Sequence, residues 1–272
     1  MRSLSGKTYH PPLPHLETDG KDLLSSDRDK SEALHAFFVN QTHLPGSDST
    51  PDASTLSFNS EKFTTLYTSP ADVYNVLRSL PTRKAPGMDG ITTRLLQECA
   101  RSISPSICML FNKSFAECRF PTLWKEAVVV PVFKRGDRSH LNNYRPIALL
   151  SSVGKVCERV VYNKLYKFVS PFLTDQQSGF RKKDGTNLQL IRLVQQWSEA
   201  LADSKYVSTV FFDLRKAFDR VWHKGLLVKL EAAGVQGPAL SWFASYLSNR
   251  QQRTRVASVV SSPSGLYHKV LY

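Results

Sequence analysis

The first candidate for chemistry in this chain is a carboxylate near the end of an apolar segment. Residues 206–214 read YVSTVFFDL, and these mostly β-branched and aromatic residues predict a buried strand. Because side chains alternate along a strand, Phe211 and Asp213 share one face. A carboxylate is costly to bury without a counter-charge. We therefore expect a cation beside Asp213, with a metal ion as one candidate, whereas the alternative is a surface aspartate that caps the following helix.

The residues that follow this strand extend the pattern. We expect a helix over 215–222, carrying Phe218 and Asp219. The pattern F-x-D-x-x-x-A-F-D, read from Phe211 to Asp219, resembles the first catalytic motif of reverse transcriptases. The form of the motif is the one found in non-LTR retrotransposons such as the jockey-like elements.

This resemblance implies a role for each residue of the motif. Asp213 is the expected catalytic metal ligand, assisted by the backbone carbonyl of Leu214. Phe218 is the expected aromatic barrier to a ribose 2′-hydroxyl, and Asp219 is expected to be a structural hydrogen-bonding partner. Such polymerases transfer a nucleotidyl group with two divalent ions, and Mg²⁺ (or Mn²⁺) is implied because hard oxygen ligands suit it.

Charge and composition agree with a nucleic-acid partner. The 272 residues carry a formal net charge of +13, which favours nucleic acid first and an anionic membrane surface second. No apolar run approaches the roughly 20 residues that span a bilayer, so we expect no membrane segment. The four cysteines form no CxxC pair, which disfavours a zinc site or a disulfide framework and fits reduced thiols in the cytosol or nucleus.

A basic β-hairpin is predicted upstream. Residues 127–133 (AVVVPVF) form the first strand, which Pro131 marks as an edge strand, and 141–150 form the returning strand. The turn at 134–138 carries three cations. It is either a solvated basic turn or a finger that closes over a triphosphate, for which arginine offers a planar fork and lysine a point charge.

The hairpin sequence favours the second alternative by resemblance. The string VPVFKRGDRSHLNNYRPIALLSSVGKVCERVV is similar to the fingers motifs of non-LTR reverse transcriptases over nearly its whole length. The resemblance implies that Lys134 and Arg145 contact the phosphates of the incoming nucleotide. Arg145 is the safer assignment, because Arg135 competes with Lys134 for the lysine position.

Two further loops resemble blocks of the same family. The string KAPGMDGI, which begins at Lys84, has turn dipeptides and resembles the block that opens the polymerase domain; its plainer interpretation is an interhelix turn. The pattern Q-x-G-F-R matches Gln177, Gly179, Phe180 and Arg181, and in the family it lies along the template. The resemblance therefore implies that Lys84, Gln177, Gly179 and Arg181 contact the template, although a solvated basic run is the alternative at Arg181.

Amphipathic patterns predict the remaining elements. Helices are expected over residues 27–41, 69–80, 92–102, 105–118, 151–169, 187–203, 224–233 and 238–248, and a strand over 253–259. The helix over 187–203 is expected to face a core with Leu188, Ile191, Val194 and Leu201, and Trp197 is expected to be a core residue as well.

The whole pattern predicts an α/β (α+β) fold with two parts. Residues 1–60 are expected to be a partly disordered linker with one docking helix, or a disordered tail. Residues 61–272 are expected to be the N-terminal part of a reverse transcriptase domain, the fingers and partial palm of a right-hand polymerase, mostly helical with a basic β-hairpin.

The resemblance also sets expectations about activity. It implies an RNA template, a DNA primer and deoxynucleotides as partners, and action in the nucleus. Relatives carry a P-Q-G motif and a strand with paired aspartates further on, and neither follows Asp219 within these 272 residues. We therefore expect an N-terminal fragment of an RNA-directed DNA polymerase that is inactive alone, with a non-catalytic nucleic-acid-binding protein as the alternative.

Overall fold

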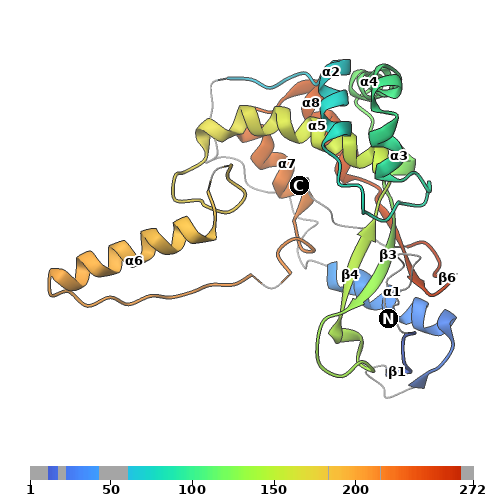
Figure 1. Cartoon of the computed structure of the whole chain (residues 1–272), viewed down its shortest axis with the longest axis horizontal. Coiled ribbons are helices and arrows are strands. Elements are labelled where there is room, and N and C mark those ends of the chain that lie inside the picture. The colour runs from blue at the N-terminus through green and yellow to red at the C-terminus, as the bar shows by residue number, and fades with distance from the viewer. Residues whose placement is uncertain (1–11, 18–22, 43–60, 183, 215, 265–272) are drawn as a thin grey trace.

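The computed structural model describes residues 12–17, 23–42, 61–182, 184–214 and 216–264 (Figure 1). Helices and strands are mixed within this part of the chain, which confirms the expected α/β class. The helices are α1 (Asp27–Thr42), α2 (Pro70–Arg78), α3 (Thr93–Glu98), α4 (Ala100–Ala116), α5 (Ser152–Val169), α6 (Thr186–Ala202), α7 (His223–Ala232) and α8 (Gly237–Leu247). Short 3-10 helices are η1 (Thr122–Trp124), η2 (Leu141–Asn143) and η3 (Ser170–Phe172). The strands are β1 (Leu16–Glu17), β2 (Leu23–Leu24), β3 (Glu126–Phe133), β4 (Tyr144–Leu149), β5 (Gln251–Val256) and β6 (Val259–Val260).

The larger core lies among α2, α4, α5 and α8, which Figure 1 shows together at one end of the molecule. Its centre is aromatic. The ring of Phe120 lies 5.5 Å from that of Trp124, 5.5 Å from that of Trp242 and 4.9 Å from that of Tyr246. The indole N–H of Trp242 donates to Ser114 Oγ at 3.0 Å, so the one polar group of this buried side chain is satisfied.

Local sequence explains where these helices begin. Ser69 and Asp72 form a capping box around Pro70 at the start of α2, as the Ser-Pro-x-Asp pattern predicts. The sequence predicted that one helix ends and the next begins just before Pro105, and this was wrong. Pro105 lies inside α4, and the boundary between the two helices is at Cys99 instead. Pro105 has no N–H for the carbonyl of Arg101, and the hydroxyl of Ser104 donates to that carbonyl at 3.5 Å.

The sheet has the order β4-β3-β5-β6. β3 pairs with β4 in antiparallel register and with β5 in parallel register, so the prediction of an edge strand was wrong. Pro131 lies opposite Pro146 in the β3–β4 pair. The backbone N–H of Lys134 donates to the carbonyl of Asn143 at 2.8 Å, and hydrogen-bonded and non-hydrogen-bonded pairs alternate along an antiparallel ladder from there. Pro131 and Pro146 therefore form a non-hydrogen-bonded pair, so their missing N–H groups cost the ladder nothing.

The ends of the other predicted strands also differ. The returning strand expected over 141–150 begins with η2 and becomes β4 only at Tyr144. The strand expected over 253–259 is a hairpin of β5 and β6, which turns at Ala257 with a φ of 51°. Both differences come from turn geometry that the apolar pattern does not encode.

The predicted docking helix is α1, and it packs on the sheet. Leu34 and Phe38 of α1 share a second, smaller core with Val129, Tyr144 and Val256. Ser26 caps the helix, since its hydroxyl accepts a hydrogen bond from Asp29 N at 3.1 Å. Residues 1–11, 18–22 and 43–60, which belong to the linker predicted over 1–60, lie outside the described part of the chain.

Two predictions of burial were wrong. Residues 206–214 are extended but are exposed and pair with no strand in the described part of the chain, and residues 216–220 form turns instead of a helix. α6 has the predicted periodicity but no buried residue, with Ile191 63% and Leu201 64% exposed. Trp197 is half-buried. Figure 1 shows α6 projecting from the body, with the extended segment leading back from its far end. Periodicity predicts an apolar face, but burial requires a partner surface.

The predicted loop at 84–91 packs tightly against the start of α5. A Cβ atom on Gly87 would lie 2.5 Å from the backbone carbon of Leu150 and 2.6 Å from the nitrogen of Ser151. The hydroxyl of Ser152 donates to the carbonyl of Ile91 at 2.7 Å. Gly87 is therefore required by the close approach of two backbones. A Cβ on Gly179, in contrast, meets no atom within 4 Å.

Gly87→Ala should lower the free energy of unfolding by about 1–3 kcal/mol, because the added methyl group forces the two backbones apart. Urea unfolding followed by circular dichroism measures this change. Gly179→Ala is the matched control and should leave the unfolding midpoint nearly unchanged. Equal midpoints for the two variants would contradict the packing assigned to Gly87.

The docking of α1 should depend on pH through His35, which is 4% exposed. Its Nε2 lies 2.7 Å from Ser264 Oγ. Burial lowers the pKa of His35 from its ordinary value of 6.5, although Glu32 opposes the shift. The unfolded chain therefore binds the proton more readily, so this contribution to stability is complete above pH 6.5 and is lost as the pH falls toward the lowered folded pKa.

The loss amounts to about 1.4 kcal/mol for each unit by which the fold lowers the pKa. Urea unfolding at pH 7.5 and pH 5.5 checks it: the wild type should lose stability at the lower pH, and His35→Gln should lose less. His140→Gln, on the exposed hairpin, should behave as the wild type. A pH dependence that His35→Gln leaves unaltered would assign the effect to other groups.

Candidate active site

The β3–β4 hairpin presents a cationic face to solvent. Arg145 lies directly opposite Val132 in the register, and Lys134 is two residues beyond Val132, so all three share one face. Val132 and Ile147 on this face are 43% and 46% exposed. Residues on the other face, among them Val129 and Tyr144, are buried against α1. The structure therefore brings the predicted phosphate contacts Lys134 and Arg145 together.

The turn of the hairpin is held by its own hydrogen bonds. Asp137 Oδ1 accepts from the backbone N–H of Ser139 at 2.8 Å, and the amide of Asn143 donates to the carbonyl of Asp137 at 2.7 Å. The hydrogen bond from Ser139 keeps the pKa of the Asp137 carboxyl below its ordinary value. The guanidinium of Arg138 lies 5.3 Å from the ring centre of Phe133. Of the three cations predicted in the turn, Arg138 thus contacts the hairpin itself, whereas Lys134 and Arg135 are exposed.

The segment that carries the candidate catalytic carboxylate is open to solvent. Asp213 is exposed, as are its neighbours Phe212 and Leu214, which are 91% and 78% exposed. The predicted buried environment of Asp213 was therefore wrong. Asp213 and Leu214 thus lie on a solvent-exposed stretch of the chain.

The turn after this segment contacts two other parts of the chain. The ring centre of Phe218 lies 5.9 Å from that of Phe180, with the planes at 76°. Nearby, Lys216 Nζ is 5.8 Å from the ring centre of Phe37, and Arg220 Nε donates to the carbonyl of Gln41 at 3.3 Å. The fold thus joins the F-x-D-x-x-x-A-F-D motif to the Q-x-G-F-R block through Phe180 and Phe218, and to α1.

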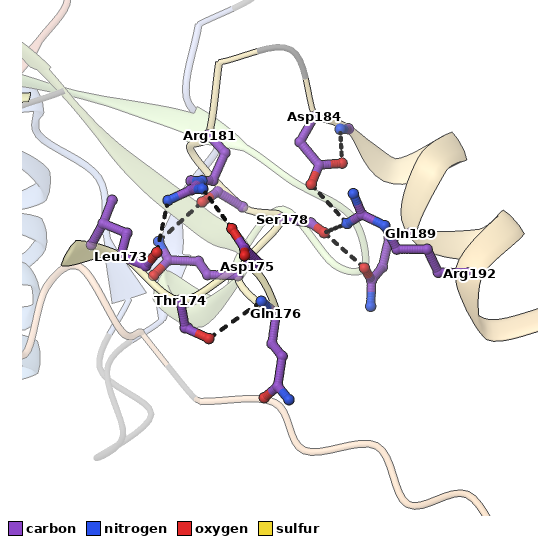
Figure 2. Close-up of polar contacts among 12 residues, drawn as sticks. Leu173, Thr174, Asp175, Gln176, Ser178, Arg181, Asp184, Gln189 and Arg192 are labelled. Carbon is purple, nitrogen blue, oxygen red and sulfur yellow. Dashed lines mark hydrogen bonds and ion pairs between the residues drawn. The ribbon is translucent and has the colours of Figure 1, made fainter. Parts of the chain in front are cut away.

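The loop of the Q-x-G-F-R block is built around Arg181 (Figure 2). Arg181 Nη1 donates to the carbonyls of Leu173 at 3.2 Å and Ser170 at 3.4 Å, and its Nη2 lies 3.4 Å from Asp175 Oδ1. Gln177 donates to the carbonyl of Gly179 at 3.2 Å. Both predicted template contacts therefore shape their own loop, and Gly179 faces open space.

A second group in Figure 2 links this loop to α6, and sequence reasoning did not find it. Arg192 Nη1 lies 2.9 Å from Asp184 Oδ2 and 3.1 Å from Ser178 Oγ, while Ser178 donates to Gln189 at 2.7 Å. The hydrogen bond from Arg192 keeps the pKa of the Asp184 carboxyl below its ordinary value. The sequence offered one signal for this group: the polar residues at 189 and 192 are spaced to share a helix face, and they follow a loop that carries Asp184.

The donor chemistry at Asp213 suits a hard divalent cation but supplies few ligands. One carboxylate and one backbone carbonyl are oxygen donors of the kind that Mg²⁺ binds, often together with substrate phosphates. Among the described residues, no group of three or more His, Cys, Asp or Glu side chains is placed to hold a metal. Asp213 and Leu214 thus fit one side of a metal site that substrate oxygens or further carboxylates complete.

The predicted site residues therefore fall into separate groups. Lys134 and Arg145 share the hairpin face, Phe180 and Phe218 are in contact, and Lys84 is exposed on the loop before α3. Figure 1 shows the extended segment 205–214 apart from the hairpin in this view. Within the described residues, no helix combines the length and apolarity that crossing a membrane needs.

Comparison with known proteins gives one consistent assignment. The chain is 33% identical over 195 residues, 71% of its length, to the probable RNA-directed DNA polymerase from transposon BS of Drosophila melanogaster. It is 37% identical over 161 residues, 58% of its length, to the RNA-directed DNA polymerase from mobile element jockey of the same species. It spans about a fifth of the length of these relatives, 21% and 18% respectively. Residues 132–267, which include the hairpin face and the Asp213 motif, match the family described as reverse transcriptase (RNA-dependent DNA polymerase). The chain therefore belongs to that family.

Proposed function

We propose that this chain is part of an RNA-directed DNA polymerase of a non-LTR retrotransposon, and that it forms the fingers and part of the palm. The observation that carries the proposal is the order of the motifs within the family match. A cationic hairpin face is followed by the Q-x-G-F-R block and then by the exposed Asp213 motif. The match to polymerases from mobile elements supports this class of reaction.

The proposed roles are those that the resemblance implies, and the positions of the groups in the fold support some of them. Asp213 and the carbonyl of Leu214 would hold a divalent ion, Mg²⁺ or Mn²⁺. When bound, such an ion would lower the pKa of a primer 3′-hydroxyl and neutralise charge on the triphosphate. Lys134 and Arg145 bind the phosphates of the incoming deoxynucleotide from the hairpin face, where Arg145 offers a planar fork. Phe218, with its ring against Phe180, excludes a ribose 2′-hydroxyl.

Four residues are proposed to lie along the RNA template: Lys84, Gln177, Gly179 and Arg181. Gln177 and Arg181 donate to carbonyls of their own loop, so they act by fixing its backbone. Gly179 then leaves open space in which a strand can approach the backbone closely. The basic charge of the chain supports a nucleic-acid partner, and the nucleus is the proposed compartment.

Asp213 belongs to the first of two carboxylate motifs in the family pattern, so DNA synthesis is proposed to require both motifs. A second candidate is a non-catalytic nucleic-acid-binding protein, which the cationic hairpin face supports as well. The two candidates differ in whether Asp213 and a divalent ion matter for function.

Residues 132–267, exchanged into the full-length jockey polymerase in place of the segment that matches the same family, should support primer extension on an RNA template. Asp213→Asn should reduce the rate about a thousandfold, since losing several kcal/mol of charge stabilisation costs about that factor. Asp203→Asn is the matched control and should be nearly neutral, because its surface pair with Lys205 is exposed. No extension by the exchanged protein, together with RNA binding in EDTA that survives Asp213→Asn, would favour the second candidate.

In the same assay, Arg145→Gln should raise the KM for deoxynucleotide roughly tenfold, because a charged hydrogen bond to phosphate is lost. Arg145→Lys should restore only part of the affinity, since a lysine cannot donate in a fork. The neighbouring exposed cation Arg135 provides the control: Arg135→Gln should leave KM almost unchanged. A larger effect at Arg135 would move the phosphate contact to that residue.

A further inference from the structure

Polar contacts between distant segments fasten α1 to the chain after β6. Glu32 Oε1 on α1 accepts from the backbone N–H of Ser262 at 2.9 Å and from the hydroxyl of the same residue at 3.2 Å. One turn along the helix, His35 Nε2 lies 2.7 Å from Ser264 Oγ. We call these four residues the α1 seam. Because Ser262 makes two of its contacts, a change at that hydroxyl acts directly on the docking of α1.

The seam presents a Ser-Pro pair in a bulge. Residues 262–263 are both exposed. Before them, the N–H of Ser261 donates to the carbonyl of Thr254 at 2.9 Å, and after them the N–H of Ser264 donates to the carbonyl of Gln252 at 3.3 Å. Two residues therefore lie opposite one residue of β5, which is the geometry of a β-bulge. A Ser-Pro pair on a surface is the element that proline-directed protein kinases recognise, and the proline needs no N–H partner there.

The other Ser-Pro pairs in the described part of the chain are engaged by the fold. Ser69 caps α2, with its hydroxyl accepting from Asp72 N at 3.1 Å. Ser104 is buried inside α4. Ser170 is half-buried at the start of η3. Among these pairs, Ser262 is thus the serine that combines exposure with a position outside any helix.

A phosphate on Ser262 would face a carboxylate. A phosphoserine carries about −1.5 to −2 charges at pH 7, and it would replace the hydroxyl that now donates to Glu32. The cations of β5 lie elsewhere: the hydroxyl of Thr254 is 3.5 Å from the imidazole of α1, so strand alternation places Arg253 and Arg255 on the face that points away from α1. The phosphate would therefore lose a hydrogen bond and gain a like charge.

The charges of α1 leave this repulsion largely in place. His35 is neutral at neutral pH, because burial lowers its pKa although Glu32 opposes the shift. Arg28 is one turn before Glu32 and projects on the same side of the helix, but its side chain is exposed, so solvent and salt screen its attraction for a phosphate. Repulsion between the phosphate and Glu32 is therefore the dominant new interaction at the seam.

Release of α1 would alter the support of two other parts of the fold. The helix buries apolar side chains against the sheet behind the hairpin. It also contacts the turn after the Asp213 segment, where Lys216 Nζ lies 5.8 Å from the ring centre of Phe37 and Arg220 Nε donates to the carbonyl of Gln41 at 3.3 Å. A modification at the seam would thus be felt at both places.

We propose that Ser262 is a phosphorylation site for a proline-directed protein kinase, and that phosphate there releases α1 from the sheet. The hydroxyl oxygen attacks the γ-phosphorus of ATP held by the kinase, and the new O–P bond forms as the bond to the bridging oxygen breaks. ADP leaves, and the hydroxyl proton passes to the carboxylate base of the kinase. The inference goes beyond the proposed function, because it requires neither Asp213 nor a nucleic acid.

The first part of the test treats the full chain with a purified proline-directed kinase and MgATP and locates phosphate by mass spectrometry of peptides. Ser262 should be phosphorylated, and Pro263→Ala should slow that reaction roughly tenfold because the kinase reads the proline. Ser170→Ala, at another Ser-Pro pair, is the matched control and should leave the phosphate on Ser262 unchanged. No phosphate on Ser262, under conditions that phosphorylate a standard Ser-Pro peptide, would overturn the site.

The second part measures the release of α1 by hydrogen exchange, with each variant compared with its own untreated form. Amides of residues 27–42 should exchange roughly tenfold faster after phosphorylation, whereas those of α5 should be unchanged. Glu32→Gln should suppress the increase, because an amide removes the like charge and donates to a phosphate oxygen. Ser262→Ala controls for phosphate elsewhere in the chain, and its α1 should exchange equally with and without the kinase.

Urea unfolding midpoints establish that the variants are folded. Phosphate on Ser262 with unchanged exchange of α1 would overturn the proposed release. An increase in exchange that Glu32→Gln leaves in place would overturn it as well, because repulsion from Glu32 would then not be the cause.

Discussion

The aromatic cluster around Phe120 is the contact on which the position of the sheet depends. Phe120 packs on Trp124 just before β3 and on Tyr246 near the end of α8, and its backbone N–H donates to Ser245 Oγ at 3.0 Å. Four residues after Tyr246, the buried Arg250 donates to the carbonyl of Tyr246 at 2.8 Å and stacks over its ring. These contacts place the first residues of β3 and β5 side by side, in the parallel register of Glu126 with Gln251. The hairpin therefore extends from the helical body that contains this aromatic cluster.

That arrangement gives the two faces of the hairpin different roles. One face is covered by α1, whose burial of Leu34 and Phe38 ties the N-terminal helix to the sheet. The other face is left open, with Lys134 and Arg145 near the turn and the half-exposed Val132 and Ile147 on the same face. A nucleic-acid ligand would thus meet cations on a surface that the core holds in place, which lowers the cost of ordering on binding.

The exposed α6 and the segment 206–214 contrast with this well-packed region. Burying a leucine or isoleucine stabilises a fold by about 1.5–3 kcal/mol, and Ile191 and Leu201 gain little of that while they are mostly exposed. α6 does make polar contacts with the loop before it, among them the ion pair of Arg192 with Asp184. In the described part of the chain, Asp213 thus lies on an exposed segment that pairs with no strand, whereas Arg145 lies on β4, which is paired with β3.

The sequence by itself determined the family and most of the helices, although not the helix expected over 215–222. Some signals depend only on residues that are close in the sequence, so the sequence alone reveals them. Examples are the capping box at Ser69, the apolar face of α5 and the motif strings. Only the tertiary structure decided which residues are buried and which segments they contact. β3 is a central strand instead of an edge strand, Arg181 donates to carbonyls of its own loop, and residues 206–214 are exposed. Periodicity indicates which side chains form an apolar face. Whether that face is buried depends on contacts with segments that are distant in the sequence.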